Sequence, residues 1–175
     1  EIRLSLVGSE MCIRDSYNEA TDSSVTEGTF TIGMLKEYTG IFDFTSASAS
    51  KYAQNITDIT GLGCARKVTA IDISTTQITV IPSFEFNGCT QLTEIKLPST
   101  VNKVSDRAFA SCSGLAEINL PDTVTEIGAY AFSSCSKLAG INAVKDGTDS
   151  ILDTLPSSLT QIGTNAFDGC SALRK

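Results

Sequence analysis

Six cysteines carry the most chemical potential in this 175-residue sequence, which contains no histidine. Cysteine side chains can pair as disulfides or bind metals such as zinc. No two of them have the Cys-x-x-Cys spacing of a zinc site, and the missing histidines exclude His-based triads, His general bases and His metal ligands. Disulfide bonds and buried free thiols are the two roles left open for these cysteines.

Other chemically active residues give weaker patterns. Glu94 and Glu117 could share a proton or hold a cation if they came close together, and a solvated surface is the alternative. Gly61-Leu62-Gly63 lacks the third glycine of a dinucleotide-binding loop, and residues 146–149 lack the ligand spacing of a calcium loop. No nucleophile–base pair is recognisable. We therefore expect no enzyme, no cofactor and no metal site.

Composition and charge limit the kinds of partner that the chain can bind. Thirteen Lys and Arg residues stand against twenty Asp and Glu residues, for a net charge of −7. Nucleic-acid binding depends on Lys and Arg that displace counterions from phosphates, so this balance argues against a nucleic-acid partner. No apolar stretch approaches the roughly 20 residues of a membrane-spanning helix. Apolar residues make up 41% of the chain, which is enough for a packed core.

The spacing of the cysteines reveals a repeat. Cys89, Cys112 and Cys135 follow one another at intervals of 23 residues, and Cys170 comes 35 residues later, as a 12-residue insertion would require. A phenylalanine precedes each of these four cysteines by three residues, and a leucine follows each by three. Self-similarity at 20 to 29 residues is the mark of a leucine-rich solenoid.

Each repeat contains the pattern of a short strand followed by a turn. In Leu-x-x-Ile-x-Leu, Ile95 and Leu97 are expected to point inward and Lys96 outward, and Pro98 ends the strand. The Ala-Phe-x-x-Cys segment predicts a short helical or 3₁₀ turn. The fold predicted is an α/β solenoid with short parallel strands on its concave face and these turns on its convex face. The four regularly spaced cysteines then lie in the core, where a free thiol behaves as a small hydrophobic group.

These repeats resemble those of the BspA-like bacterial leucine-rich repeat proteins, of the treponemal type. The motif L-x-x-I-x-L-P-x-x-V-x-x-I-x-x-x-A-F-x-x-C-x-x-L extends from about Ile81 to Leu173. A looser copy, Ile56 to Pro82, is similar to the internalin-like class. The resemblance covers roughly residues 56–175 and implies a secreted or surface-displayed protein; several members of the family act in adhesion.

The two ends of the chain differ from the array. Residues 1–16 share no column with the repeats and resemble translated sequencing-adapter read-through, so we expect a non-native leader. Residues 17–55 are expected to form an N-terminal capping region with a short helix at 30–38 and a small-residue connection over 42–54. The array over 56–175 stops partway into a repeat, which predicts a piece of a longer solenoid.

Two functions fit this organisation. The first is a non-catalytic module that binds a host matrix or cell-surface protein, because solenoids present extended faces to partners. Its predicted binding face consists of the outward polar residues of the strands: Thr69, Asp72, Thr93, Glu94, Lys96, Glu117, Asn119 and Asn142. The insertion at 143–154 is a second candidate contact site. The alternative function is a structural spacer that holds another domain, such as an enzyme, away from the cell.

Overall fold

The structure is a computed structural model. It describes residues 39–45, 53–54, 56–142, 144–145, 151–152 and 154–173. The predicted leader at 1–16 and the predicted capping helix at 30–38 lie outside these residues.

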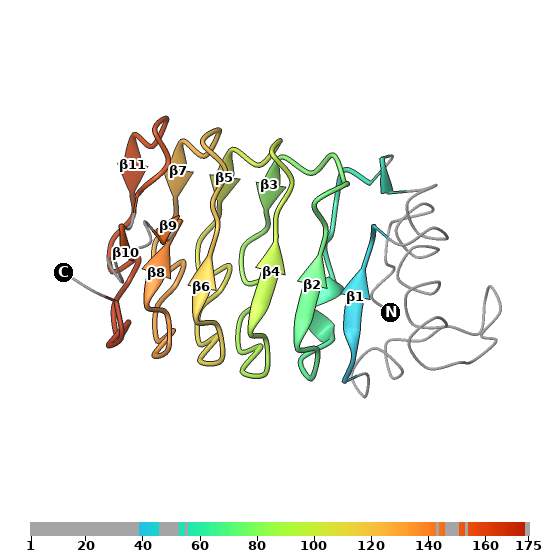
Figure 1. The fold of residues 1–175 in the computed structure, drawn as a ribbon, viewed down its shortest axis with the longest axis horizontal. Helices are drawn as coiled ribbons and strands as arrows, with labels where there is room; N and C mark the ends of the chain where they lie inside the picture. The colour runs from blue at the N-terminus through green and yellow to red at the C-terminus, as the bar shows by residue number, and fades with distance from the viewer. Residues whose placement is uncertain are drawn as a thin grey trace, which may run out of the picture.

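Figure 1 shows a stack of repeats with two rows of short strands. The first row contains β1 (Ile41–Asp43), β2 (Ala70–Asp72), β4 (Glu94–Lys96), β6 (Glu117–Ile118) and β8 (Gly140–Ile141). The second row contains β3 (Val80–Ile81), β5 (Lys103–Val104), β7 (Glu126–Ile127) and β11 (Gln161–Ile162). Neighbouring strands pair in parallel within β1–β2–β4, within β6–β8 and along the whole second row. The predicted leucine-rich repeat fold, with stacked parallel strands and few helices, is confirmed.

Strands of the first row follow the predicted alternation. Ile71 of β2 lies opposite Ile95 of β4 in the register, and both side chains are buried in the core. Lys96, the next residue after Ile95, is exposed. One face of the row therefore closes the core and the other faces solvent, as a strand with period two requires.

The second row of strands is a feature that the sequence interpretation missed. The Val-x-x-Ile part of the repeat motif, which holds Val101 and Val104, is apolar, but its spacing of three residues predicts no strand. In the structure, Val104 of β5 pairs in register between Ile81 of β3 and Ile127 of β7, and all three side chains are buried. Strands of two residues are too short to show an alternating pattern, which explains why periodicity did not find them.

Strand β1 corrects a further expectation. The sequence interpretation placed a small-residue connection over 42–54, yet Phe42 pairs with Ile71 of β2 and extends the first row. Phe42 and Phe44 are both buried in the core. Their spacing of two residues matches that of Ile71 and Ile73, so an alternating apolar pair was present in the sequence.

Turns replace helices on the opposite side of each repeat. A 3₁₀ helix, η1 (Leu62–Cys64), forms in the first of these segments that the structure describes. In the later repeats, single i to i+3 bonds occur, such as Cys112 N–H to Phe109 O at 3.1 Å. Two residues with positive φ, Arg107 at 56° before this turn and Ser111 at 61° within it, prevent a continuous helix.

Backbone hydrogen bonds join the turns of successive repeats as well as their strands. The N–H of Phe86 donates to Ala108 O, that of Phe109 to Ala131 O, and that of Phe132 to Ala166 O, each at 2.8 Å. These bonds hold equivalent residues of neighbouring repeats one strand spacing apart.

A column of stacked phenylalanines fills the core beneath these turns. The ring centroids of Phe86 and Phe109 are 5.2 Å apart, those of Phe109 and Phe132 are 5.2 Å apart, and those of Phe132 and Phe167 are 5.4 Å apart. The first three rings are fully buried, whereas Phe167 is partly buried. Each inner ring therefore packs against two others.

The described part of the predicted insertion forms a short hairpin-like pair. Strand β9 (Val144–Lys145) and strand β10 (Ile151–Leu152) are antiparallel, with Leu152 opposite Val144. The pair lies between β8 and β11 in the sequence, and β11 still pairs in parallel with β7 of the second row.

Truncation of a stacked ring tests this core. Phe109→Ala should lower the free energy of unfolding by roughly 3–5 kcal/mol, as truncation of a large buried side chain does. Urea unfolding followed by circular dichroism measures the change. Phe84, an aromatic residue with 55% of its surface exposed, provides the control: Phe84→Asn should cost less than about 1 kcal/mol. A cost below about 1 kcal/mol for Phe109→Ala would contradict the core position of this ring.

Candidate functional site

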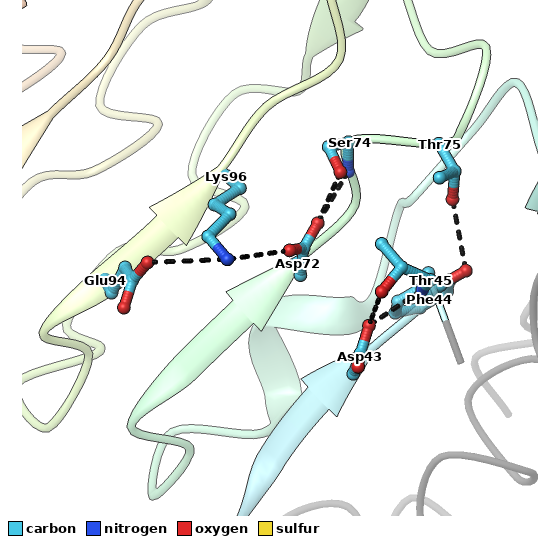
Figure 2. Close-up of polar contacts among 8 residues, drawn as sticks. All are labelled: Asp43, Phe44, Thr45, Asp72, Ser74, Thr75, Glu94 and Lys96. Atoms are coloured by element: carbon cyan, nitrogen blue, oxygen red, sulfur yellow. Dashed lines mark hydrogen bonds and ion pairs between the residues drawn. The ribbon is translucent and has the colours of Figure 1, made fainter.

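The candidate site is the solvent side of the first row of strands, called here the strand face. Parallel pairing places Asp43 of β1, Asp72 of β2 and Lys96 of β4 in one register row. Ala70 and Glu94 are partners in the row beside it. Figure 2 shows Asp72 and Lys96 pointing toward each other between neighbouring strands.

Lys96 links two strands of this face through its ammonium group. Its Nζ lies 3.1 Å from Asp72 Oδ2 and 3.8 Å from Glu94 Oε1. The side chain of Lys96 is 59% exposed and that of Asp72 is 16% exposed. Solvent screens such a pair, so its main effect is to fix where the charges stand rather than to stabilise the fold strongly.

Asp72 is held from two sides. Its Oδ1 accepts hydrogen bonds from the N–H of Ser74 at 3.1 Å and from the Ser74 hydroxyl at 2.6 Å. Partial burial alone would raise the pKa of this carboxyl, but the bonds from Ser74 and Lys96 outweigh burial and keep the pKa of Asp72 below its usual value. Asp43 repeats the arrangement one strand away, where its Oδ1 accepts from the N–H and hydroxyl of Thr45 (Figure 2).

Three of the predicted binding residues use their side chains inside the fold. The Thr93 hydroxyl donates to the carbonyl of Thr69 at 2.9 Å, and the Thr69 hydroxyl faces the carbonyl of Gly40 at 3.5 Å. Asn142 accepts from the N–H of Leu120 at 2.5 Å and donates to the Leu120 carbonyl at 2.9 Å. Thr93 and Asn142 thereby continue the hydrogen-bond ladder, which reduces what they can offer to a partner.

The remaining predicted residues lie on the open surface. Glu94, Glu117 and Asn119 are all exposed. Glu117 begins β6, which lies beside β4 in Figure 1 although the two strands belong to separate sheets. The structure thus brings Asp72, Glu94 and Lys96 into one cluster and leaves Glu117 and Asn119 on the neighbouring strand.

A shallow hollow accompanies the charged cluster. It has a volume of about 230 Å³. The lining residues are Ile41, Asp43, Ala70, Ile71, Asp72, Glu94 and Lys96. The predicted face does not include Ile41 and Asp43, because no strand is predicted at β1 and the connection predicted over 42–54 covers two of its three residues. The repeated Asp-x-Ser/Thr sequence at Asp43 and Asp72 is the signal that could have revealed it.

The cysteine column contains free thiols. Cys64, Cys89, Cys112, Cys135 and Cys170 all lack a disulfide partner among the residues that the structure describes. Cys112 Sγ donates to the Phe86 carbonyl at 3.0 Å, and Cys135 Sγ donates to the Phe109 carbonyl at 3.1 Å. Burial raises the pKa of Cys112 to about 12, which keeps the thiol protonated.

Within the described ranges, no three His, Cys, Asp or Glu side chains gather closely enough to hold a metal ion. The same ranges contain no helix with the length and apolar character needed to cross a bilayer.

Comparison with known proteins identifies the repeats. The family model for the BspA type leucine-rich repeat region matches residues 62–153 and 153–175, with six copies. The chain belongs to this family. No curated protein matches the chain.

Solved structures from three bacteria share the fold of this BspA-type chain. A leucine-rich repeat protein from Bacteroides ovatus is 33% identical (TM-score 0.53), with 63% of this chain and 25% of that chain covered. The leucine-rich repeat protein of T. pallidum is 31% identical (TM-score 0.53), with 63% and 45% covered. A protein from Faecalibacterium prausnitzii, described as a leucine rich cell surface protein, is 24% identical (TM-score 0.52), with 70% and 36% covered. The chain therefore spans less than half of each of these proteins.

The ion pair of Asp72 makes a pH-dependent prediction. A carboxyl whose pKa is lower in the folded state than its ordinary value of 3.8 contributes stability above that value, and this contribution disappears as the pH falls through the folded pKa. Asp72→Asn should therefore lower the urea midpoint at about pH 7, and the difference from the unaltered chain should shrink by about pH 3. Asn119→Ala, which removes no titrating group, serves as the control. An equal difference at both pH values would exclude this role of Asp72.

The thiol column makes a second prediction. With a pKa of about 12, only roughly one Cys112 side chain in 10,000 is a thiolate at pH 8. Iodoacetamide should therefore label the half-buried Cys64 well before the buried Cys112 in the folded chain, and both equally in urea. Peptide mapping by mass spectrometry measures the two rates. Equal labelling in the folded chain would show that Cys112 is not enclosed in the core.

Proposed function

We propose that the chain is a non-catalytic protein-interaction module of a bacterial cell-surface or secreted protein and that it binds its partner through the strand face. The observation that carries this proposal is the fixed charge cluster of Asp72, Glu94 and Lys96 beside a shallow hollow. Charges held in place by neighbours lose little freedom when a partner binds, which favours recognition.

The composition of the strand face indicates how it would bind. Apart from Ile41, its exposed residues are polar, small or charged, and among the residues that the structure describes it has none of the Tyr and Trp side chains that dominate interface hot spots. We therefore expect affinity to be distributed over many weak polar contacts along the stack. Such a face suits a partner with its own repeated polar surface, and the net charge of −7 opposes nucleic acid.

Cell-surface location and adhesion to host matrix or cell-surface proteins are part of this proposal. Family membership supports them, as does the description of the Faecalibacterium prausnitzii protein as a cell surface protein. The family resemblance also connects such repeats with adhesion.

A structural spacer is the second candidate. The observation in its favour is that Thr93 and Asn142, on the strand face, direct their side chains to the backbone of neighbouring strands. A face used for internal bonding serves rigidity more than recognition. The complete reading frame separates the two functions: a cell-wall anchor or further repeats would favour adhesion, and an attached catalytic domain would favour the spacer.

Simultaneous loss of the exposed charges tests binding by the strand face. Replacement of Glu94, Lys96 and Glu117 by alanine should weaken binding to the extracellular-matrix protein that the chain recognises by about tenfold, because three polar interface contacts are lost. Surface plasmon resonance against a panel of immobilised matrix proteins identifies that partner and measures the change.

The matched control removes an ion pair from the second row of strands. Lys103 Nζ lies 2.9 Å from Glu126 Oε1, and Lys103→Ala with Glu126→Ala should leave the affinity within about twofold. Undiminished binding by the triple variant would reject the strand face. Failure of every matrix protein to bind the unaltered chain would favour the spacer.

A further inference from the structure

A column of large side chains lies on the turn side of the repeats, away from the strand face. Phe84, Arg107, Tyr130 and Asn165 each come two residues before a phenylalanine of the stacked core column. All four have positive φ, at 62°, 56°, 56° and 56° respectively. This backbone conformation is uncommon for bulky side chains and persists only where the surrounding structure enforces it.

Members of this column contact one another across repeats. The guanidinium carbon of Arg107 lies 5.8 Å from the ring centroid of Phe84 and 4.6 Å from that of Tyr130. Asn165 Nδ2 donates to the Tyr130 hydroxyl at 3.0 Å. A cation between two aromatic rings is attracted to both, so Arg107 holds the row together. Phe84, at the end of the row, leaves 55% of its surface exposed.

A pocket of about 600 Å³ opens beside Phe84. Its volume falls within the range of small-ligand sites. Its lining includes Gly61, Gly63, Arg66, Lys67, Phe84 and Glu85. They come from η1 with its flanks and from the turn after β3, so two successive repeats form the pocket.

Glu85 gives this pocket a fixed wall. Its carboxylate accepts the N–H of Gly63 at 2.8 Å and the N–H of Gly61 at 3.2 Å. A Cβ at Gly63 would stand 1.4 Å from the Glu85 carbonyl oxygen, so only glycine permits this close approach of the two repeats. Burial raises the pKa of Glu85, partly offset by these two N–H groups. The carboxylate is thus committed to the backbone of η1.

Cationic side chains line this pocket together with the carboxylate of Glu85, whose oxygens already accept hydrogen bonds from Gly61 and Gly63. Arg66 and Lys67 line it, and Arg107 stacks on the ring of Phe84. Lys96 and Lys103 are occupied by ion pairs with carboxylates on their own rows of strands, and Lys67 also has an interaction partner. Arg66 is exposed and has no carboxylate within ion-pair distance among the residues that the structure describes.

We propose that this pocket binds an acidic peptide segment that carries an aromatic side chain. A carboxylate of the segment would form a bidentate pair of hydrogen bonds with the guanidinium of Arg66. Its aromatic ring would pack on the exposed side of Phe84, where the Arg107 contact fixes the ring in place. This site is separate from the strand face and gives the repeat module a second, chemically different docking point.

A fluorescein-labelled peptide of sequence Gly-Glu-Asp-Phe-Glu-Gly provides a direct probe for the full-length chain, with binding followed by fluorescence anisotropy. Arg66→Gln should weaken binding by about tenfold because it removes the charge-assisted contact. Phe84→Asn should weaken binding about fivefold, because it removes the aromatic ring. Asn165 occupies the equivalent position of a later repeat with nearly the same φ, so asparagine fits this turn without added strain.

Two controls make the experiment decisive. A peptide with Gln and Asn in place of its acidic residues should bind about tenfold more weakly than the acidic probe, and Lys103→Gln on the second row of strands should change the affinity less than twofold. Equal binding of the neutral and acidic peptides would overturn the proposal. So would absence of binding, an unchanged affinity in both pocket variants, or an equal loss in Lys103→Gln.

Discussion

Backbone hydrogen bonds between successive repeats are the constraint on which the rest of this structure depends. They occur in both rows of strands and again in the turns, where Phe86, Phe109 and Phe132 donate to the next repeat at 2.8 Å. Paired residues of neighbouring repeats therefore stand one strand spacing apart. Each paired side chain therefore contacts the side chain at the same position of the next repeat, which must be either an identical residue that packs against it or a residue of complementary charge or shape.

This constraint explains the columns of identical or paired side chains. Phenylalanine rings stack at 5.2 Å, and thiols of Cys112 and Cys135 donate to the phenylalanine carbonyl of the preceding repeat. At outward positions the same spacing pairs unlike groups, such as Asp72 with Lys96 or Lys103 with Glu126. Opposite charges attract across these two pairs, whereas Asp43 and Asp72, which are register partners of like charge, each accept hydrogen bonds from a neighbour of their own, Thr45 or Ser74.

The period of the cysteine and phenylalanine columns was sufficient to predict the repeat, the buried face of the first row of strands and the family. The period did not predict features that consist of only one or two residues. The two-residue strands of the second row show no periodicity, and β1 lay in a segment rich in small residues. The site was predicted in part, since Asp72, Glu94 and Lys96 do cluster. The hydrogen bonds of Thr93 and Asn142 to the backbone were not predicted, because they depend on which carbonyl lies opposite each side chain, and sequence spacing does not specify that. The column of Phe84, Arg107 and Tyr130 was missed because its members differ in type and share only a backbone conformation.

The side-chain amide of Asn142 has a consequence for how such arrays change over time. Its two hydrogen bonds satisfy the N–H and the carbonyl of Leu120, which would otherwise need backbone partners on a neighbouring strand. The φ of Asn142, 50°, turns the chain out of the row of strands. The backbone of Leu120 therefore has hydrogen-bond partners at the point where the insertion begins. Insertions of different length or sequence could be exchanged between Asn142 and β11 without exposing an unpaired backbone group of Leu120, which makes this position a natural graft point for new loops on an unchanged scaffold.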